Sequence, residues 1–136
     1  MTLMEFFARD RFASAAGVRL TCIRAGHAEA EMAVTPHVLN ASGYVQGGAL
    51  FTLADLTFAA AVNTQSPLAV SVNANIVFIS NVREGTLRAV ADVAHDHHRL
   101  PCAQVRISDA TGRLIALFTS SAYRIEKGST GAEGLM

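Results

Sequence analysis

Apolar and polar residues alternate along several stretches of the chain, which is the pattern of β-strands with one buried face. The clearest stretch starts at Val70: side chains 70, 72, 74, 76 and 78 face one way, and those between them face the other. Similar patterns predict strands over residues 18–24, 28–34, 86–94, 103–108 and 113–125. The turn Ala25-Gly26-His27 is expected to join the first two strands as a hairpin.

Two other stretches have helical spacing. Met4, Phe7, Phe12 and neighbouring alanines predict one short amphipathic helix within residues 1–16, and Gly17 ends it. The stretch from Gly47 to residue 62 predicts a long helix that is apolar on nearly all sides and must therefore be surrounded. We expect an α+β fold in which an antiparallel sheet of about six strands wraps round this helix.

The length and composition of the chain are typical of a single domain with a hydrophobic core. The chain has 136 residues, of which 51% are hydrophobic, so we expect one domain over residues 1–126 and a loose tail over 127–136. Its formal net charge is zero, which gives no electrostatic argument for binding nucleic acid or an anionic membrane. Only 16% of residues are charged, which suggests that other copies of the chain cover part of the surface.

The expected location is the cytoplasm. Charged residues interrupt the first twelve positions, unlike a signal peptide, and the apolar run 49–62 is too short and too polar to span a membrane. Cys22 and Cys102 are far apart and form no CxxC pair, so we expect two reduced thiols.

Asp55 is the only charged residue of the long helix. Burying an ionised carboxylate is costly unless a partner compensates it. Asp55 is therefore either bonded to nearby groups, such as Thr52 one turn earlier, or used chemically, and the residues alone leave both alternatives open.

Gly47 and Gly48 open the same helix. The first amides of a helix have no internal acceptor, and glycine allows close approach, so this start could bind a developing oxyanion. A plain helix start remains the alternative. Asp55 lies about 12 Å along the helix from Gly47, at about 1.5 Å per residue, whereas a reacting carbon must be about 3 Å from both groups. An enzyme built on them would be a dimer in which Asp55 of one copy faces Gly47 of the other.

The residues also resemble a known family. Leu39-Asn40, the stretch from Gln46 to Asp55, and the ending Tyr123-Arg124-Ile125 are similar to hotdog-fold acyl-CoA thioesterases of the phenylacetate-degradation (PaaI) group. The resemblance implies hydrolysis of an acyl-CoA thioester, of aryl or phenylacetyl type, to a carboxylic acid and coenzyme A. It implies a homodimer or homotetramer with sites at the subunit interface and no cofactor, since coenzyme A is part of the substrate.

The resemblance also implies roles for single residues. Asp55 matches the nucleophile or general base, Gly47 the amide that polarises the thioester carbonyl, and Asn40 the residue that positions the acid or the water. Ser71 matches a strand residue near the site. We include Gly48 and Asn73 among the substrate-binding candidates.

Gln46 departs from the family, which has a histidine there. Glutamine can donate a hydrogen bond but cannot transfer a proton near pH 7. A non-catalytic acyl-CoA binding protein of the same fold is therefore the alternative function, and a hydratase is disfavoured.

The segment from His95 to Arg99 is rich in cations. On a strand His95 and His97 would share a face, but no third metal ligand is evident, so we expect a solvated turn and no metal. His98 and Arg99 are candidates for contacting the phosphates of coenzyme A, with Arg83 and Arg88 as further candidates. His27 and His37 are expected to be ordinary loop residues, and no nucleotide-binding or serine-nucleophile motif is present.

Overall fold

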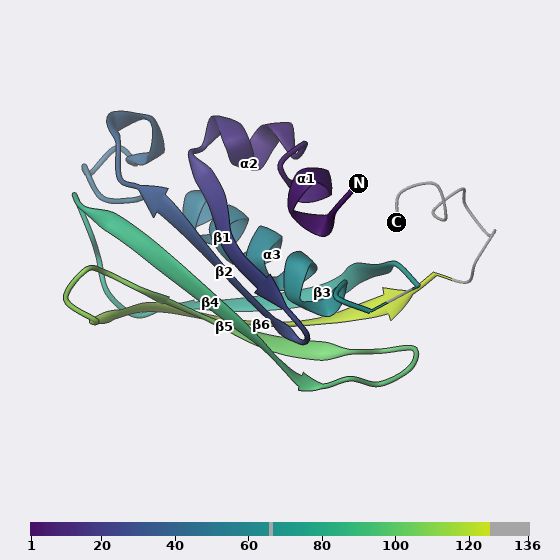
Figure 1. Ribbon diagram of the computed structural model, residues 1–136. Helices are drawn as coiled ribbons and strands as arrows, with labels where there is room; N and C mark the ends of the chain where they lie inside the picture. Colours follow the sequence, from purple (N-terminus) through teal and green to yellow (C-terminus); the bar gives the residue numbers. More distant parts are fainter. Residues whose placement is uncertain (66, 126–136) are drawn as a thin grey trace.

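A computed structural model describes residues 1–65 and 67–125, so the predicted tail lies outside the described residues. The elements are α1 (Leu3–Phe7), α2 (Arg11–Ala15), β1 (Val18–Arg24), β2 (His27–Ala33), the 3-10 turn η1 (Pro36–Val38), α3 (Gly47–Val62), β3 (Ala69–Phe78), β4 (Thr86–His95), β5 (Cys102–Ser108) and β6 (Leu114–Arg124). The strands form one antiparallel sheet in the order β1-β2-β4-β5-β6-β3. This sheet curls round α3, which confirms the expected α+β fold (Figure 1).

The core lies between α3 and the concave face of the sheet. Phe58 and Phe118 meet there with ring centroids 6.0 Å apart, and both are almost fully buried. Burial of a side chain of this size contributes roughly 1.5–3 kcal/mol. The central strands present small residues to the helix, which leaves room for α3 to lie close to the sheet: Ala28, Ala30, Ala89 and Ala91 are fully buried.

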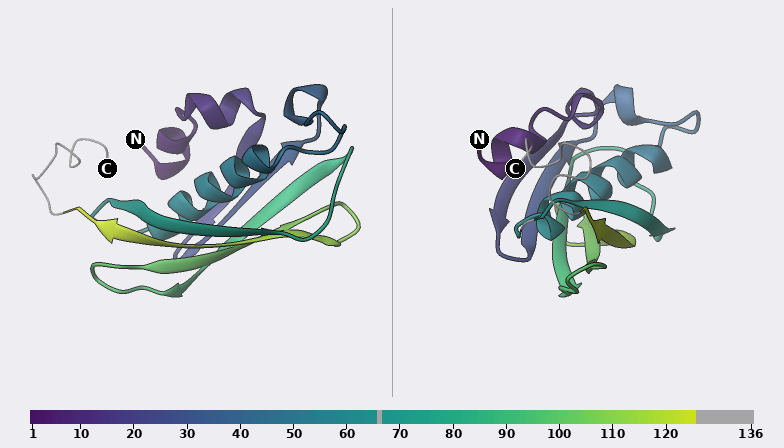
Figure 2. Two further views of the ribbon diagram at one scale, coloured as in Figure 1. Left: turned by 180° about the vertical axis from the view of Figure 1, so that it is seen from behind. Right: turned by 90° about the vertical axis from the view of Figure 1, so that its right-hand side faces the viewer.

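One stripe of α3 is not covered. Phe51, Asp55 and Ala59 recur every four residues, so they share one face of the helix. None of the three is fully buried, unlike Leu53, Ala54 and Phe58 beside them. The sheet and the N-terminal helices α1 and α2 therefore surround α3 only in part (Figure 2).

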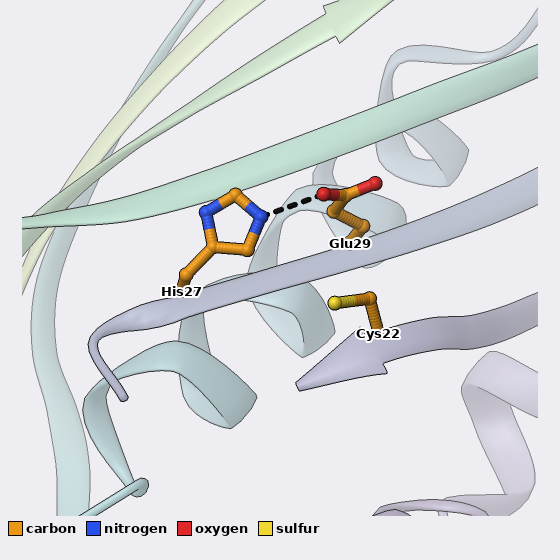
Figure 3. Close-up of side chains that lie close together, drawn as sticks. All are labelled: Cys22, His27 and Glu29. Carbon is orange, nitrogen blue, oxygen red and sulfur yellow. Dashed lines mark hydrogen bonds and ion pairs between the residues drawn. The ribbon is translucent and has the colours of Figure 1, made fainter. Parts of the chain in front are cut away.

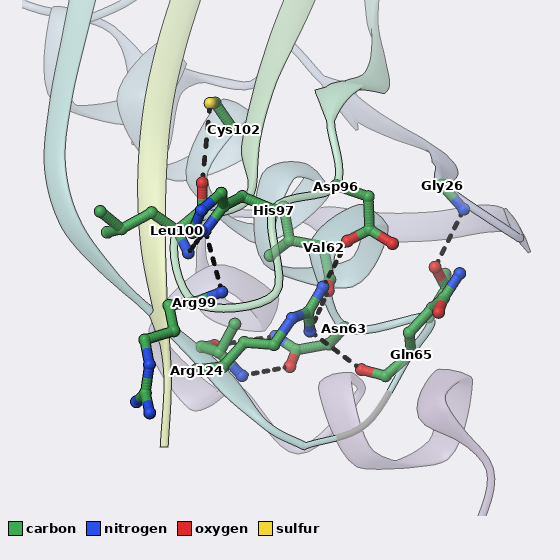
Figure 4. A network of polar contacts seen from close by, with 12 residues as sticks. Gly26, Val62, Asn63, Gln65, Asp96, His97, Arg99, Leu100, Cys102 and Arg124 are labelled. Atoms are coloured by element: carbon green, nitrogen blue, oxygen red, sulfur yellow. Dashed lines mark hydrogen bonds and ion pairs between the residues drawn. The ribbon is translucent and has the colours of Figure 1, made fainter. Parts of the chain in front are cut away.

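The C-terminal end of α3 is held by two polar side chains. Asn63 donates to the carbonyls of Ala59 and Ala69 and accepts from the Ala69 amide. Arg124, only 6% exposed, donates through Nη1 to the carbonyl oxygens of residues 62, 65 and 67, and through Nη2 to Asp96 at 2.6 Å. Figure 4 shows how these contacts tie the helix end to β6 and to the β4–β5 turn.

Strand β3 is an edge strand with a bulge between Ser71 and Asn73. Ser71 pairs with buried Ala122, so it faces the helix, whereas Val70 pairs with exposed Tyr123 on the other face. The unbroken alternation expected from Val70 onward is therefore wrong, because the extra residue reverses the facing of the strand.

The single N-terminal helix predicted within residues 1–16 is also wrong, because α1 and α2 are separate. The carboxylate of Asp10 accepts from the Ala13 amide at 2.9 Å and caps the start of α2. His27 is likewise not a loop residue: it begins β2 and is 8% exposed. Among the described residues, no helix is long and apolar enough to cross a membrane.

Candidate active site

The start of α3 presents two free backbone N–H groups. Gln46 is extended and precedes the helix, and its carbonyl accepts from the amides of Ala49 and Leu50. The amides of Gly47 and Gly48 have no acceptor among the described residues. They lie at the positive end of a sixteen-residue helix, so they can receive a negatively charged oxygen.

An aromatic ring explains why Gly47 has no side chain. A Cβ atom built on Gly47 would lie 2.9 Å from the tip of the Phe78 ring, at the end of β3. A Cβ atom on Gly48 would instead meet the side-chain oxygen of Gln46, which is exposed and can move. Phe78 is itself 55% exposed, so it covers the first turn of α3 and also faces solvent.

Asp55 is half-buried and has no hydrogen-bond partner among the described residues. Thr52, the expected partner, donates to the Gly48 carbonyl at 2.8 Å instead. Burial raises the pKa of Asp55, and the negative charge of Asp10 raises it further. A carboxylate without a partner and with increased basicity is suited to taking a proton.

Asn40 lies in the loop that leads into α3. Its Oδ1 atom accepts from the amides of Ser42 and Tyr44, which fixes the loop. The loop is joined to the helix start because the Gln46 amide donates to the Val38 carbonyl at 2.8 Å. The Asn40 side chain is exposed, and its amide nitrogen has no partner among the described residues. Asn40, Gln46 and Gly47 therefore belong to one loop–helix unit.

Residues 42–116, which include the N-terminus of α3 and Asp55, match the thioesterase superfamily. The chain belongs to this superfamily. It is 33% identical over 126 residues to the acyl-coenzyme A thioesterase PaaI of Escherichia coli K12, covering 92% of this chain and 90% of that protein.

Solved structures agree with this family. The structure of the E. coli PaaI protein has a TM-score of 0.83 at 30% identity, covering 92% of this chain and 97% of that one. A mutant of the phenylacetic acid degradation protein PaaI from Thermus thermophilus has a TM-score of 0.81 at 29% identity, covering 85% and 100%. The expected hotdog fold and the likeness to the PaaI group are confirmed.

The other site candidates of this thioesterase-superfamily chain do not all meet at the same place. Ser71 faces α3, and its hydroxyl lies 3.0 Å from that of Ser120. Asn73, beyond the bulge, pairs with Ser121 and points to the opposite face of the sheet. The structure thus separates Ser71 from Asn73.

His98 and Arg99 lie in the β4–β5 turn. His97 accepts from the amides of Arg99 and Leu100 at 3.0 Å each, so this segment is a turn, as expected. Asp96 of the same turn bonds to Arg124 at the C-terminal end of α3, so the turn lies at the far end of the helix from Gly47. Within one chain, His98 and Arg99 are remote from the oxyanion donors.

Three further residues lie beside the site: the sequence assigned no role to Phe78 or Asp10, and it gave Arg83 only as a candidate for the phosphates of coenzyme A. The Phe78 ring covers Gly47, and the negative charge of Asp10 raises the pKa of Asp55. In the loops beside the helix start, Arg83 donates a hydrogen bond to the hydroxyl of Tyr44 at 2.6 Å. A signal for Asp10 was available, since an aspartate before a short apolar segment is a common helix N-cap. The contacts of Phe78 and Arg83 join segments that are distant in sequence, so no local sequence pattern predicts them.

Proposed function

We propose that this protein hydrolyses acyl-CoA thioesters, with Asp55 as the catalytic carboxylate and Gly47 as the oxyanion donor. One observation carries the proposal: a half-buried carboxylate without a hydrogen-bond partner among the described residues lies on the same helix as two amides without acceptors there. A half-buried carboxylate without such a partner is costly to keep for structure alone. The membership in the thioesterase superfamily supports the same reaction.

In the proposed reaction, the thioester carbonyl oxygen accepts a hydrogen bond from the Gly47 amide. Asp55 removes a proton from water, and the hydroxide adds to the carbonyl carbon while the developing oxyanion is held at the helix start. The tetrahedral intermediate then breaks its carbon–sulfur bond, and the departing thiolate takes the proton from Asp55. The products are the carboxylic acid and coenzyme A. Direct attack by Asp55 is the other route, and it would leave an acyl–enzyme adduct detectable by rapid-quench mass spectrometry.

Two copies of the chain complete the proposed site. Asp55 and Gly47 are about 12 Å apart along one helix, too far to act on one carbonyl group. The edge strand β3 exposes Val72, Val77 and Phe78, and natural proteins rarely leave a long apolar edge unpaired. We propose that two β3 strands pair and bring the open stripes of two antiparallel α3 helices together. Asp55 of one subunit would then face Gly47 of the other, and such dimers could pair further into tetramers.

Gln46 holds geometry in this scheme. Its side chain lies over Gly48, where it can donate a hydrogen bond to the thioester carbonyl, and it need not transfer a proton. Asn40, through an amide nitrogen that has no partner within the described part of the chain, is proposed to position the attacking water. No cofactor is required beyond the coenzyme A of the substrate.

The proposed substrate class is aryl- or phenylacetyl-type acyl-CoA, as the names of the PaaI relatives suggest. The Phe78 ring beside Gly47 supplies an aromatic contact where the acyl group would begin. Arg83 is a better-placed candidate for the coenzyme A phosphates than His98 or Arg99 of the same chain, because its loop borders the loop before α3. We place the activity in the cytoplasm, where the two free thiols Cys22 and Cys102 would stay reduced.

The test is release of free thiol from a panel of aryl-, phenylacetyl- and straight-chain acyl-CoAs. Asp55→Asn should lower kcat by roughly 10²–10⁴-fold, the range for loss of a general base. Glu84→Gln, at an exposed loop position, is the matched control and should leave the rate unchanged. Equal rates for Asp55→Asn and the parent would remove Asp55 from the mechanism. Tight acyl-CoA binding without turnover, with activity gained by Gln46→His, would instead establish a binding protein.

A further inference from the structure

A second cluster of chemically active side chains lies on the convex face of the sheet, away from α3. It consists of Cys22 on β1 and His27 and Glu29 on β2 (Figure 3). His27 and Glu29 are two residues apart on one strand, so they share a face, and Ala28 between them is buried against the core. The cluster is therefore separate from the proposed thioesterase site.

A β-bulge brings Cys22 into this cluster. The pairing of β1 with β2 shifts between Leu20 and Cys22, so that Cys22 lies opposite Glu29. Without the extra residue, Thr21 would take that place and Cys22 would face the core with Ala28. Re-aiming a side chain in this way is a known role of bulges.

The donor atoms are close enough to share one ion. The sulfur of Cys22, a ring nitrogen of His27 and a carboxylate oxygen of Glu29 all lie within 4.8 Å of one another. Nε2 of His27 is 2.6 Å from Oε2 of Glu29. A tetrahedral ion with bonds of about 2.0–2.3 Å needs its nitrogen and oxygen ligands about 3.3 Å apart. A metal ion would take the place of the hydrogen bond between these two atoms, which would have to move apart by about 0.7 Å.

The surroundings of the cluster suit a cation. Nδ1 of His27 is bonded to Asp92 on β4 at 2.6 Å, which leaves Nε2 directed at Glu29. A carboxylate that orients a histidine through its second nitrogen is the usual outer partner of a metal-binding histidine. With a Cys22 thiolate, the three anionic groups would balance one divalent ion together with Arg88, which is paired with Glu29.

We propose that Cys22, His27 and Glu29 form a site for a divalent transition metal of the zinc class, oriented by Asp92. One thiolate, one imidazole and one carboxylate form a mixed ligand set suited to zinc or cobalt(II) and poorly suited to magnesium or calcium. Three protein ligands leave a fourth position for water or for an external ligand. The metal has no part in the proposed thioester hydrolysis, since its ligands face away from α3.

The test is titration of the chelator-treated full chain with cobalt(II) under reducing conditions. A thiolate-to-cobalt charge-transfer band should appear and saturate at one ion per chain, and zinc should displace it. Cys22→Ser should abolish the band, whereas Cys102→Ser, which alters the other free cysteine, should leave it unchanged. Asp92→Asn should weaken the affinity by roughly 10–100-fold, as expected for loss of an outer partner.

Two outcomes would overturn the site: no band at one equivalent of cobalt, or a band that survives Cys22→Ser. If the substitution disturbs folding, Glu29→Gln gives a second reading, because it should weaken cobalt affinity while keeping the side-chain shape. Thioesterase activity of Cys22→Ser should equal that of the parent, so the two proposals can fail independently.

Discussion

Replacing Arg124 by methionine tests how the C-terminal end of α3 is held. The side chain is 6% exposed and donates to three backbone carbonyls and to Asp96. Nη1 has only two hydrogens to donate to the three carbonyls. The substitution to methionine therefore removes the equivalent of two good hydrogen bonds to the backbone. Hydrogen bonds to a charged group contribute about 1.5–3 kcal/mol each. Asp96 is partly exposed and can be rehydrated, and methionine retains much of the apolar stem. The expected loss is about 3–5 kcal/mol.

The assay is urea or thermal unfolding of the parent and the variant. For 136 residues, the unfolding entropy of roughly 2.1 cal/mol/K per residue converts this loss to a Tm lowered by about 10–17 °C. Arg19→Met is the matched control. Its guanidinium pairs with Glu31 at 2.8 Å but is 72% exposed, so the loss should stay below about 1 kcal/mol. Equal losses for the two variants would refute the reasoning that burial, and not the ion pair, makes Arg124 important.

The remaining predictions concern the proposed active site and its dimer. Because burial raises the pKa of Asp55, Asp55→Asn should unfold at a higher urea concentration than the parent near neutral pH. This advantage should vanish below about pH 4, where the carboxyl group is protonated in both the folded and the unfolded state. A difference in stability that stays constant across pH would contradict this prediction. Asp10→Asn keeps a capping side chain but removes a charge that raises this pKa, so the acid limb of the pH–rate profile should move to lower pH, and an unmoved limb would exclude the coupling. Gly47→Ala must displace the Phe78 ring and should lower kcat. Gly48→Ala meets only the mobile side chain of Gln46, so it should keep the fold and lose less activity. Equal activities of the two variants would argue against a special role for the Gly47 amide. Val77→Lys on the exposed edge of β3 should shift sedimentation from dimer to monomer and lower the activity with it, and an unchanged dimer would place the interface elsewhere.

The chain order of the elements could be predicted because each depends on local pattern. Alternation located every strand to within about two residues, and the uninterrupted apolar stretch after Gly47 located α3. The errors have local physical causes that override the periodicity. Asp10 caps a second helix, and the bulge after Ser71 reverses the facing of β3.

The candidate site was predictable only where its members are neighbours in sequence. Gln46, Gly47 and Asp55 share one helix and its start, so their spacing could be judged from helix geometry. That Asp55 has no partner among the described residues could not be foreseen, because it depends on Thr52 bonding elsewhere. His27 shows the same limit: Glu29 lies two residues along the same strand, but the second carboxylate partner, Asp92, is 65 residues away and is brought to His27 by the pairing of β2 with β4.

The Phe78 ring links the assembly of the protein to its catalytic turnover, because it takes part in both. It lies against Gly47 at the start of α3 and also belongs to the exposed end of the edge strand. In the proposed dimer, whatever covers β3 also sets the position of this ring and so the access to the helix amides. Specific activity should therefore depend on protein concentration, falling on dilution as subunits separate. Selection acting on how tightly the copies associate would then also change how fast each copy works.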